Sequence, residues 1–329
     1  MRRGRYPFIA GFLVLPLALY GFFVLSPYVQ TVVYSFTDWS GFSPEFNFVG
    51  MANYADLLKD EVFLRAVGHN AVILTIYPLV TILLALFFAF MLNVGGRGNR
   101  AGIRGVAGSG LYKIIFFFPQ VMSIAIVAIL WGKVFQSNEG GLLNALGIKL
   151  GLVDPADPPL WLGESDSVPV GPFKLGPLIL EAPVVLWCLI AIAVWVGVGF
   201  YLVLFSAGMQ SIPKDIFEAA LLDGSSRVQT FFRVTLPLLW EHLSVAWVYL
   251  GIAALDFYLL VIALTQGVGG GGPDNASHVM SSWMLYTSFQ SSRIDKFGYG
   301  CAMAIAIAMF TLIFAIIQLR ITRRDKIEL

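Results

Sequence analysis

The chain has 329 residues, of which 58% are hydrophobic and 12% charged, with a net charge of +1 and a mean hydropathy of +0.79. Soluble domains carry about 45–50% apolar and about 25% charged residues, so this composition excludes an ordinary soluble protein. The near-zero net charge also excludes a global field that would attract nucleic acid.

Six apolar stretches are long enough, or nearly so, to cross a membrane as helices. A hydrocarbon core about 30 Å thick needs about 20 helical residues. In lipid only helices or closed barrels satisfy the backbone, and no stretch alternates as barrel strands do. We predict an all-α polytopic membrane protein, a single transmembrane domain over 1–329, with spans at about 7–36, 71–92, 114–135, 182–205, 243–264 and 298–319.

The first stretch follows a basic start formed by Arg2, Arg3 and Arg5. A cleaved signal peptide shares that start, but its apolar region is about 7–15 residues long and ends at a small-residue cleavage site. The stretch at 7–36 is longer, and no such site follows it. The sequence therefore favours an uncleaved first span.

The distribution of Lys and Arg predicts the orientation of the spans. Fourteen of the 21 basic residues fall in segments on the same side as the N-terminus, and six fall in segments on the other side. Acidic residues show the opposite bias. Because segments rich in Lys and Arg stay in the cytoplasm, we expect both termini and the loop at 207–241 to be cytoplasmic.

The outer loops differ in the structure that they predict. Apolar residues recur at helical spacing over 52–64, which predicts a short helix after the first span. The second outer loop, about 136–181, contains proline runs at 154–159 and 168–172 that are expected to break any regular element. A run of glycines at 267–272 opens the third outer loop.

The inner loop at 207–241 contains signals for two short helices. Pro213 and Asp215 suit the first turn of a helix, and Gly224 suits the left-handed residue that ends one. A second helix is expected over 225–233. Solvated connectors also contain such helices, so these signals alone leave the role of the loop open.

One face of the first predicted helix is suited to contact with a partner. Ile216, Ala219 and Ala220 have the spacing of residues that share a helix face. Because alanine side chains are small, they would let another protein approach the helix backbone closely.

The same loop carries a pattern found in a known family. Glu218, Ala219, Ala220, Asp223 and Gly224, followed by Leu236-Pro237, resemble the E-A-A…G…L-P loop of binding-protein-dependent importer permeases. Ser225 stands where an alanine is usual, a small-for-small change. Three outer segments resemble the maltose-type sugar permeases of that family, namely Phe48-Val49-Gly50-Met51-Ala52-Asn53-Tyr54, Gly140-Gly141-Leu142-Leu143-Asn144, and Gly271-Gly272-Pro273 with the later Gly298-Tyr299. The resemblance covers nearly the whole chain.

The resemblance implies a permease subunit of an ATP-driven importer of di- or oligosaccharides in the bacterial cytoplasmic (inner) membrane. The implied partners are a second homologous permease, two ATPase subunits and an extracytoplasmic solute-binding protein or lipoprotein. The inner loop would dock on the ATPase as a coupling helix through Glu218, Ala219, Ala220, Asp223 and Gly224.

This chain is not expected to be an enzyme or to bind a cofactor. It has no G-x-x-x-x-G-K-[ST] phosphate-binding loop, because the glycine run at 269–272 lacks the following lysine. ATP and magnesium would therefore be bound by the partner ATPase.

The resemblance also implies substrate contacts near the middle of the fourth and fifth spans. Aromatic faces and hydrogen-bonding groups suit sugar rings, although aromatics and glycines in apolar helices commonly serve packing. Asp256 is the sharpest candidate, because a carboxylate at span depth costs about 2.5–3.5 kcal/mol on insertion and should face a cavity or a partner. The corresponding residues are Trp195, Gly197, Phe200, Tyr201, Asp256, Phe257 and Tyr258.

Other interpretations stay open at this point. The same importer class carries glycerol phosphate or polyols. A secondary transporter would more often show internal repeats and broken helices. A membrane enzyme would need clustered catalytic groups. The histidines and cysteines of this chain are instead dispersed, at His69, His242, His278, Cys188 and Cys301. They therefore predict neither a metal site nor a disulfide.

Overall fold

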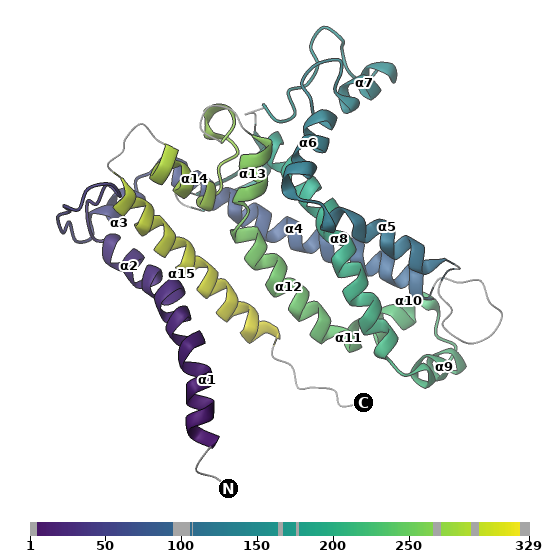
Figure 1. Ribbon diagram of the computed structural model, residues 1–329. Helices are drawn as coiled ribbons and strands as arrows, with labels where there is room; N and C mark the ends of the chain where they lie inside the picture. The colour runs from purple at the N-terminus through teal and green to yellow at the C-terminus, as the bar shows by residue number, and fades with distance from the viewer. Residues whose placement is uncertain are drawn as a thin grey trace. The chain divides into compact units, whose positions relative to one another are not determined.

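A computed structural model describes residues 5–94, 106, 108–163, 167–175, 178–265, 271–290 and 296–322 (Figure 1). It forms two compact units, one from Met1–Leu64 with Trp283–Phe310 and the other from Arg65–Ser282 with Thr311–Leu329. Several residues behind the predicted orientation and the predicted glycine loop lie outside the described residues: Arg2, Arg3, Arg97, Arg100, Arg104, Arg293, Arg323, Arg324, Lys326 and the glycines at 267–270.

The first unit contains the N-terminal helices α1 (Arg5–Tyr20) and α2 (Ser26–Tyr34), which the π-helical turn η1 (Gly21–Leu25) joins. Residues Gly11–Tyr34 are apolar enough to cross a membrane, and none of that stretch is buried within the chain. Large apolar side chains exposed all along a helix suit contact with lipid or another protein rather than with water.

A short helix, α3 (Ala52–Leu57), follows as the sequence predicts. The amide of Asn53 donates to the carbonyls of Ser35 and Thr37, both at 2.9 Å, and so satisfies backbone groups at the end of the first span. Asp60 then accepts hydrogen bonds from the backbone N–H groups of Val62 and Phe63 at the start of α4 (Glu61–Val94). These bonds give a structural role to the segment that resembles sugar permeases.

Asp60 also holds together elements from the two ends of the chain. Its second carboxylate oxygen accepts from the indole of Trp283 at 3.0 Å and from the hydroxyl of Tyr299 at 2.8 Å. Trp283 lies in α14 (Met280–Leu285), which the π-helical turn η4 (Tyr286–Gln290) follows, and Tyr299 lies in α15 (Phe297–Thr322).

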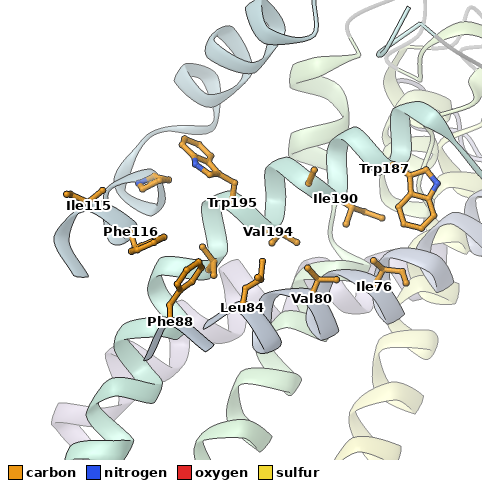
Figure 2. Close-up of a pocket in the computed structure, with 13 residues that line it drawn as sticks. Ile76, Val80, Leu84, Phe88, Ile115, Phe116, Trp187, Ile190, Val194 and Trp195 are labelled. Carbon is orange, nitrogen blue, oxygen red and sulfur yellow. The ribbon is translucent and has the colours of Figure 1, made fainter. Parts of the chain in front are cut away.

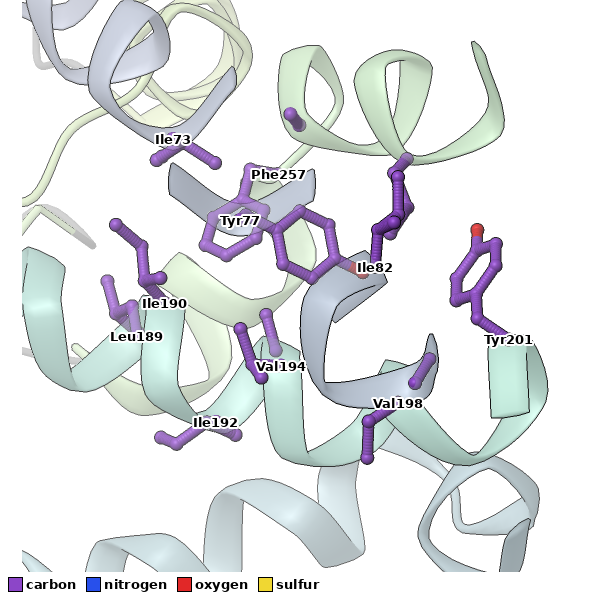
Figure 3. Packing of buried hydrophobic residues seen from close by; sticks show 14 of the residues in the cluster. Ile73, Tyr77, Ile82, Leu189, Ile190, Ile192, Val194, Val198, Tyr201 and Phe257 are labelled. Atoms are coloured by element: carbon purple, nitrogen blue, oxygen red, sulfur yellow. The ribbon is translucent and has the colours of Figure 1, made fainter. Parts of the chain in front are cut away.

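The core of the second unit is built around α4 and α8 (Val184–Ser211). Helix α8 is apolar on all sides, as expected of a helix inside a bundle. Its fully buried side chains include Leu186, Leu189, Ile192, Leu202 and Phe205, and Figure 3 shows part of this cluster.

The third span is broken rather than continuous. Helices α5 (Ser109–Val121) and α6 (Ile124–Val134) meet at 98°. Met122 and Ser123 between them are extended, with ψ of 142° and 147°. The prediction of one helix over 114–135 is therefore wrong in its continuity. Hydropathy reports where a segment is apolar, whereas the break is a backbone feature near Pro119, which lacks an N–H for the helix.

The fifth span is also broken, and twice. The segment α10 (Arg227–Thr230), η2 (Phe231–Thr235) and α11 (Leu236–Leu238) meets α12 (Trp240–Leu255) at 71°, and α12 stops before α13 (Tyr258–Leu264). Residues 243–264 thus form two helices rather than one. Broken helices are a feature expected of secondary transporters. Their presence here therefore does not distinguish an importer permease from a secondary transporter.

Four helices among the described residues are long and apolar enough to cross a membrane, and there are six candidates if each bent pair counts as one span. The long ones are Gly11–Tyr34, Glu61–Asn93, Val184–Ser211 and Phe297–Ile321. The chain is therefore a mostly helical protein with several membrane-spanning segments.

The loop at 136–181 contains more regular structure than its prolines predict. After α7 (Leu142–Lys149), strand β1 (Ser167–Leu175) pairs antiparallel with β2 (Leu178–Pro183). The expectation that 168–172 breaks every regular element is wrong, whereas the fold is mostly helical apart from this hairpin. A two-stranded hairpin has only edge strands, where proline is tolerated, and the register shifts between Pro169 and Lys174.

Candidate functional site

The break in the fifth span presents the one carboxylate that the sequence places inside an apolar run. Asp256 has φ −104° and ψ 54°, outside the helical region, and its N–H still donates to the carbonyl of Ile252 at 3.1 Å. The side chain of Asp256 is exposed in this chain rather than enclosed in the core. Its carboxylate therefore borders open space, as the cost of burying a charge requires.

That space is a cavity of about 220 Å³, here called the break cavity, where helices α4, α5, α6, α8 and α13 approach the break. Its polar groups are the phenol of Tyr77, the amide of Gln120 and the carboxylate of Asp256, and the rest of its wall is apolar. The lining residues are Tyr77, Gln120, Ile124, Ala193, Val196, Gly197, Asp256, Phe257, Leu259 and Leu260.

Aromatic and small residues shape one wall of the break cavity. The rings of Tyr77 and Phe257 pack edge to face with centroids 5.9 Å apart, and Figure 3 shows them side by side. A Cβ on Gly197 would lie 3.2 Å from the Tyr77 hydroxyl oxygen. The glycine therefore leaves room for the phenol where α8 passes α4.

The structure brings together only some of the predicted path residues. Gly197, Asp256 and Phe257 line the break cavity. Phe200 is 44% exposed on α8, and Tyr201 is buried in the core one turn beyond Gly197, outside the lining of the break cavity. Tyr258 packs partly buried against that core.

Trp195 belongs to a different and larger cavity, of about 660 Å³. Its lining comes from α4, α5 and α8 and is almost entirely hydrocarbon (Figure 2). The Trp195 ring packs edge to face on Trp131 with centroids 5.4 Å apart. A wall of this kind suits apolar chains rather than the hydroxyl edges of a polar solute.

A buried asparagine on α4 holds the end of α12 in place beside the break at Asp256. Asn70 on α4 is 1% exposed. Its amide N–H donates to the carbonyl of Ala254 at 2.8 Å, and its amide oxygen accepts from the N–H of Met280 at 2.8 Å. Ala254 lies in the last turn of α12, where carbonyls lack helical partners, and Met280 opens α14, where N–H groups lack them. One side chain thus satisfies two helix ends that lie far apart in sequence.

Two buried histidines extend this polar cluster. The Nδ1–H of His69 donates to the carbonyl of His278 at 2.8 Å, and the imidazole of His278 lies 3.1 Å from the Ser282 hydroxyl. Burial, with the neighbouring His69 adding to it, lowers the pKa of His278 to about 4. The imidazole of His278 is therefore neutral at pH 7, and it belongs to the packing between α4 and α14.

The predicted inner helix is present as α9 (Lys214–Leu222). Gly224 follows it with φ +75°, the left-handed conformation that the sequence predicts. Ile216, Ala219 and Ala220 do not act as one face, however. Ala220 is 8% exposed and packs inward, whereas Ala219 points outward. The inward position of Phe217, which is 4% exposed, sets this rotation, because a large aromatic gains most from burial.

The outward face of α9 combines acidic, small and apolar groups. Glu218, Ala219 and Asp223 are exposed, and the Leu222 side chain is 90% exposed. These exposed side chains leave this face of α9 open to contact with another protein.

The segment Gly140–Asn144 organises the loop that follows α6. Asn144 is completely buried, donates to the carbonyls of Gln136 and Pro159, and accepts from the indole N–H of Trp161 at 2.8 Å. A Cβ on Gly141 would overlap the Gln136 carbonyl oxygen. Both residues are therefore needed for the path of the loop.

Comparison with known proteins places the whole chain in one family. The model of the binding-protein-dependent transport system inner membrane component family matches residues 7–326.

The chain belongs to this family of transport permeases.

Two relatives of the permease are named for the uptake of sugars. It is 37% identical over 319 residues to the diacetylchitobiose uptake system permease protein NgcF of Streptomyces coelicolor, covering 97% of this chain and 83% of the relative. It is 31% identical over 317 residues to the multiple sugar-binding transport system permease protein MsmF of Streptococcus mutans, covering 96% and 95%. The resemblance drawn from the inner loop is thus confirmed over nearly the entire permease.

The fold of the permease also matches a solved structure. A crystal structure of a bacterial ABC transporter involved in the import of the acidic polysaccharide alginate aligns with a TM-score of 0.74 at 20% identity. The alignment covers 98% of the permease and 97% of that chain. At this identity the match concerns the fold.

Sequence reasoning missed Tyr77 and Gln120 in the break cavity. Both lie in apolar stretches that were predicted only as membrane spans. A weak signal of irregular backbone lies beside each of them, since Pro78 follows Tyr77 and Pro119 precedes Gln120. Their convergence with Asp256 depends on helix packing, which spacing along one helix does not contain.

Replacing Asn70 by alanine should destabilise the permease by about 1–3 kcal/mol, because the buried carbonyl of Ala254 loses its donor. Asn70→Asp keeps the size but also loses that donor, so it should not restore stability. Thermal unfolding of purified protein measures the effect. Thr75→Val is the matched control, since Thr75 lies on the same helix and its hydroxyl bonds only locally, to the carbonyl of Ala71. Equal melting temperatures for the Asn70 variants and the control would contradict the role of Asn70.

Proposed function

We propose that this permease is the transmembrane subunit of an ATP-driven importer of di- or oligosaccharides. The observation that carries the proposal is the family match over residues 7–326, together with relatives that are named for the uptake of diacetylchitobiose and of multiple sugars. The carbohydrate cargo is inferred for this chain from those names. Glycerol phosphate or a polyol is the alternative cargo within the same class.

The proposed topology has six spans, with both termini and α9 in the cytoplasm of a bacterial cell, as parts of one transmembrane domain over 1–329. Four long apolar helices and two bent pairs support this number. The bias of Lys and Arg along the sequence supports the orientation.

The proposed partners are a second homologous permease, two ATPase subunits and an extracytoplasmic solute-binding protein. A solved relative of the same fold is described as a bacterial alginate transporter in complex with a pentasaccharide-bound periplasmic protein, which supports the last of these. The exposed face of α9, with Glu218 and Leu222, is the surface that we assign to the ATPase. The ATPase would hold ATP and magnesium. When the ATPase closes, α9 would move with it and so change the arrangement of the spans.

The substrate path is proposed to run through the break cavity. Its cluster of phenol, amide and carboxylate beside the ring of Phe257 suits a sugar, which has hydroxyl edges and an apolar face. Of the residues first considered, Gly197, Asp256 and Phe257 stay in this proposal, and Tyr77 and Gln120 join them. A cavity of about 220 Å³ in one chain is small, and we infer that the second permease completes the path.

Asp256→Asn is expected to raise the KM for uptake about 5- to 10-fold, because a charged hydrogen bond worth about 1.5–3 kcal/mol becomes a neutral one worth about 0.5–1.5 kcal/mol. Tyr77→Phe should raise the KM by about 2- to 10-fold, since it removes a neutral hydrogen bond worth about 0.5–1.5 kcal/mol. Uptake of radiolabelled sugar into proteoliposomes containing the whole importer measures both values.

Phe200→Leu is the matched control on α8, because the side chain of Phe200 is exposed away from the break cavity. A KM change for Phe200→Leu as large as that for Asp256→Asn would contradict the proposed path. The cargo itself is tested by calorimetric titration of the cognate binding protein with a panel of di- and oligosaccharides, polyols and glycerol phosphates. Tight binding of only the last two classes would replace the sugar assignment.

A further inference from the structure

The outer helix α7 carries an apolar face that nothing in the described part of the chain covers. Leu142, Leu146 and Leu150 are 63%, 55% and 62% exposed. Their spacing of four residues puts them on one side of the helix. Leu152, just beyond the helix, is 78% exposed and adds to the apolar surface.

The rotation of α7 about its axis is fixed by its opposite face. Asn144 is fully buried and hydrogen bonded to Gln136, Pro159 and Trp161. A Cβ on Gly147 would approach the Val153 side chain to 2.6 Å. Because this side is held by packing and by satisfied polar groups, the leucines cannot turn inward.

The depth of α7 follows from its links to two membrane spans. Residues 135–141 connect it to the end of α6, and seven residues reach at most about 25 Å. Trp161 links α7 to α8. Its indole N–H donates to Asn144 of α7, and its backbone carbonyl accepts from the thiol of Cys188, 3.8 Å away, in the second turn of α8. Two side-chain links therefore tie α7 to the outer end of a span, the level at which tryptophan side chains gather in membrane proteins. Figure 1 shows α7 next to the C-terminal end of α6.

We propose that α7 lies in the membrane–water interface and inserts Leu142, Leu146 and Leu150 into the outer leaflet. Helices of this kind bury an apolar face by about 5–10 Å at the boundary of headgroups and acyl chains. The only charged residue of α7 is Lys149, beside the leucines in the last turn, where its amine is placed to meet lipid phosphate. A solute-binding protein would have to leave this surface in every cycle, and transient interfaces of that sort are no more apolar than ordinary surface.

The lipid contact is tested by the depth of spin labels on the importer in lipid nanodiscs, with its permease and ATPase partners present and the binding protein absent. Single cysteines replace Leu146 or Leu150 in a background with Cys188→Ser and Cys301→Ser. Asp157→Cys is the control, because Asp157 is an exposed residue of the same outer loop. Labels at both leucine positions should show a several-fold higher ratio of oxygen to nickel-chelate accessibility than the label at the control position.

A ratio at Leu146 and Leu150 equal to that at Asp157 would overturn the proposal. So would protection of these labels that develops only when sugar-loaded binding protein is added, since that result would make α7 a docking surface for protein. Both leucines are exposed, so their substitution does not disturb the core. The measurement reports the depth of α7 in the bilayer and not uptake. The inference rests on the proposed topology only in calling the leaflet the outer one. A negative result would therefore leave the transport proposal intact.

Discussion

Gly199→Ala is expected to destabilise the permease by about 3 kcal/mol, at the upper end of the usual cost of overpacking. A Cβ at position 199 would overlap the backbone carbonyl of Phe116 and crowd the Cα of Phe117. Because these are backbone atoms of α5, no side-chain rotation relieves the overlap, and α5 must separate from α8. The measurement is thermal unfolding of the detergent-purified protein, followed by size-exclusion chromatography.

Two glycine substitutions serve as graded controls for Gly199→Ala. Gly132 on α6 has no heavy atom within 4 Å of an added Cβ, so Gly132→Ala should be neutral or stabilise by about 0.5–1 kcal/mol. Gly197→Ala should fall between them, since its Cβ would meet the hydroxyl end of Tyr77 at 3.2 Å. The same melting temperature for all three variants would show that α5 and α8 do not pack as described.

Glu218→Lys is expected to abolish ATPase assembly and uptake together. Breaking a partly desolvated charge pair at a protein interface costs about 2–5 kcal/mol, which is about 30-fold or more in affinity. Glu218→Gln should have a smaller effect, because it removes the charge without adding repulsion. Co-purification of the ATPase with the tagged permease, at equal permease loading, measures the loss.

Glu139→Lys is the matched charge reversal for this experiment, because Glu139 is exposed on a loop assigned to the opposite side of the membrane. It should leave ATPase recovery unchanged. Leu222→Ala provides a second variant of the same surface without a change of charge, since the Leu222 side chain is 90% exposed. Full ATPase recovery with Glu218→Lys and with Leu222→Ala would remove α9 from the docking surface.

The candidate site shows which parts of a membrane protein its sequence predicts. Asp256 is identified from sequence because a carboxylate inside an apolar run is costly and therefore rare. Gly197 and Phe257 follow from the resemblance. Trp195 and Phe200 share the same helix as Gly197, yet α8 turns them to an apolar cavity and to the outside, respectively. Residues on one helix point in all directions, so proximity in sequence does not imply a common site.

The amino-acid sequence by itself determined that this is a membrane protein of several apolar helices, with a short helix in the loop at 207–241 that ends at Gly224. These properties depend on local composition and on single-residue backbone preferences, which lie within one segment. Only the tertiary structure decided that the third and fifth spans are broken and that Tyr77, Gln120 and Asp256 line one cavity. The physical reason is that a break is stable only where distant groups satisfy its backbone, as Asn70 does for Ala254 and Met280.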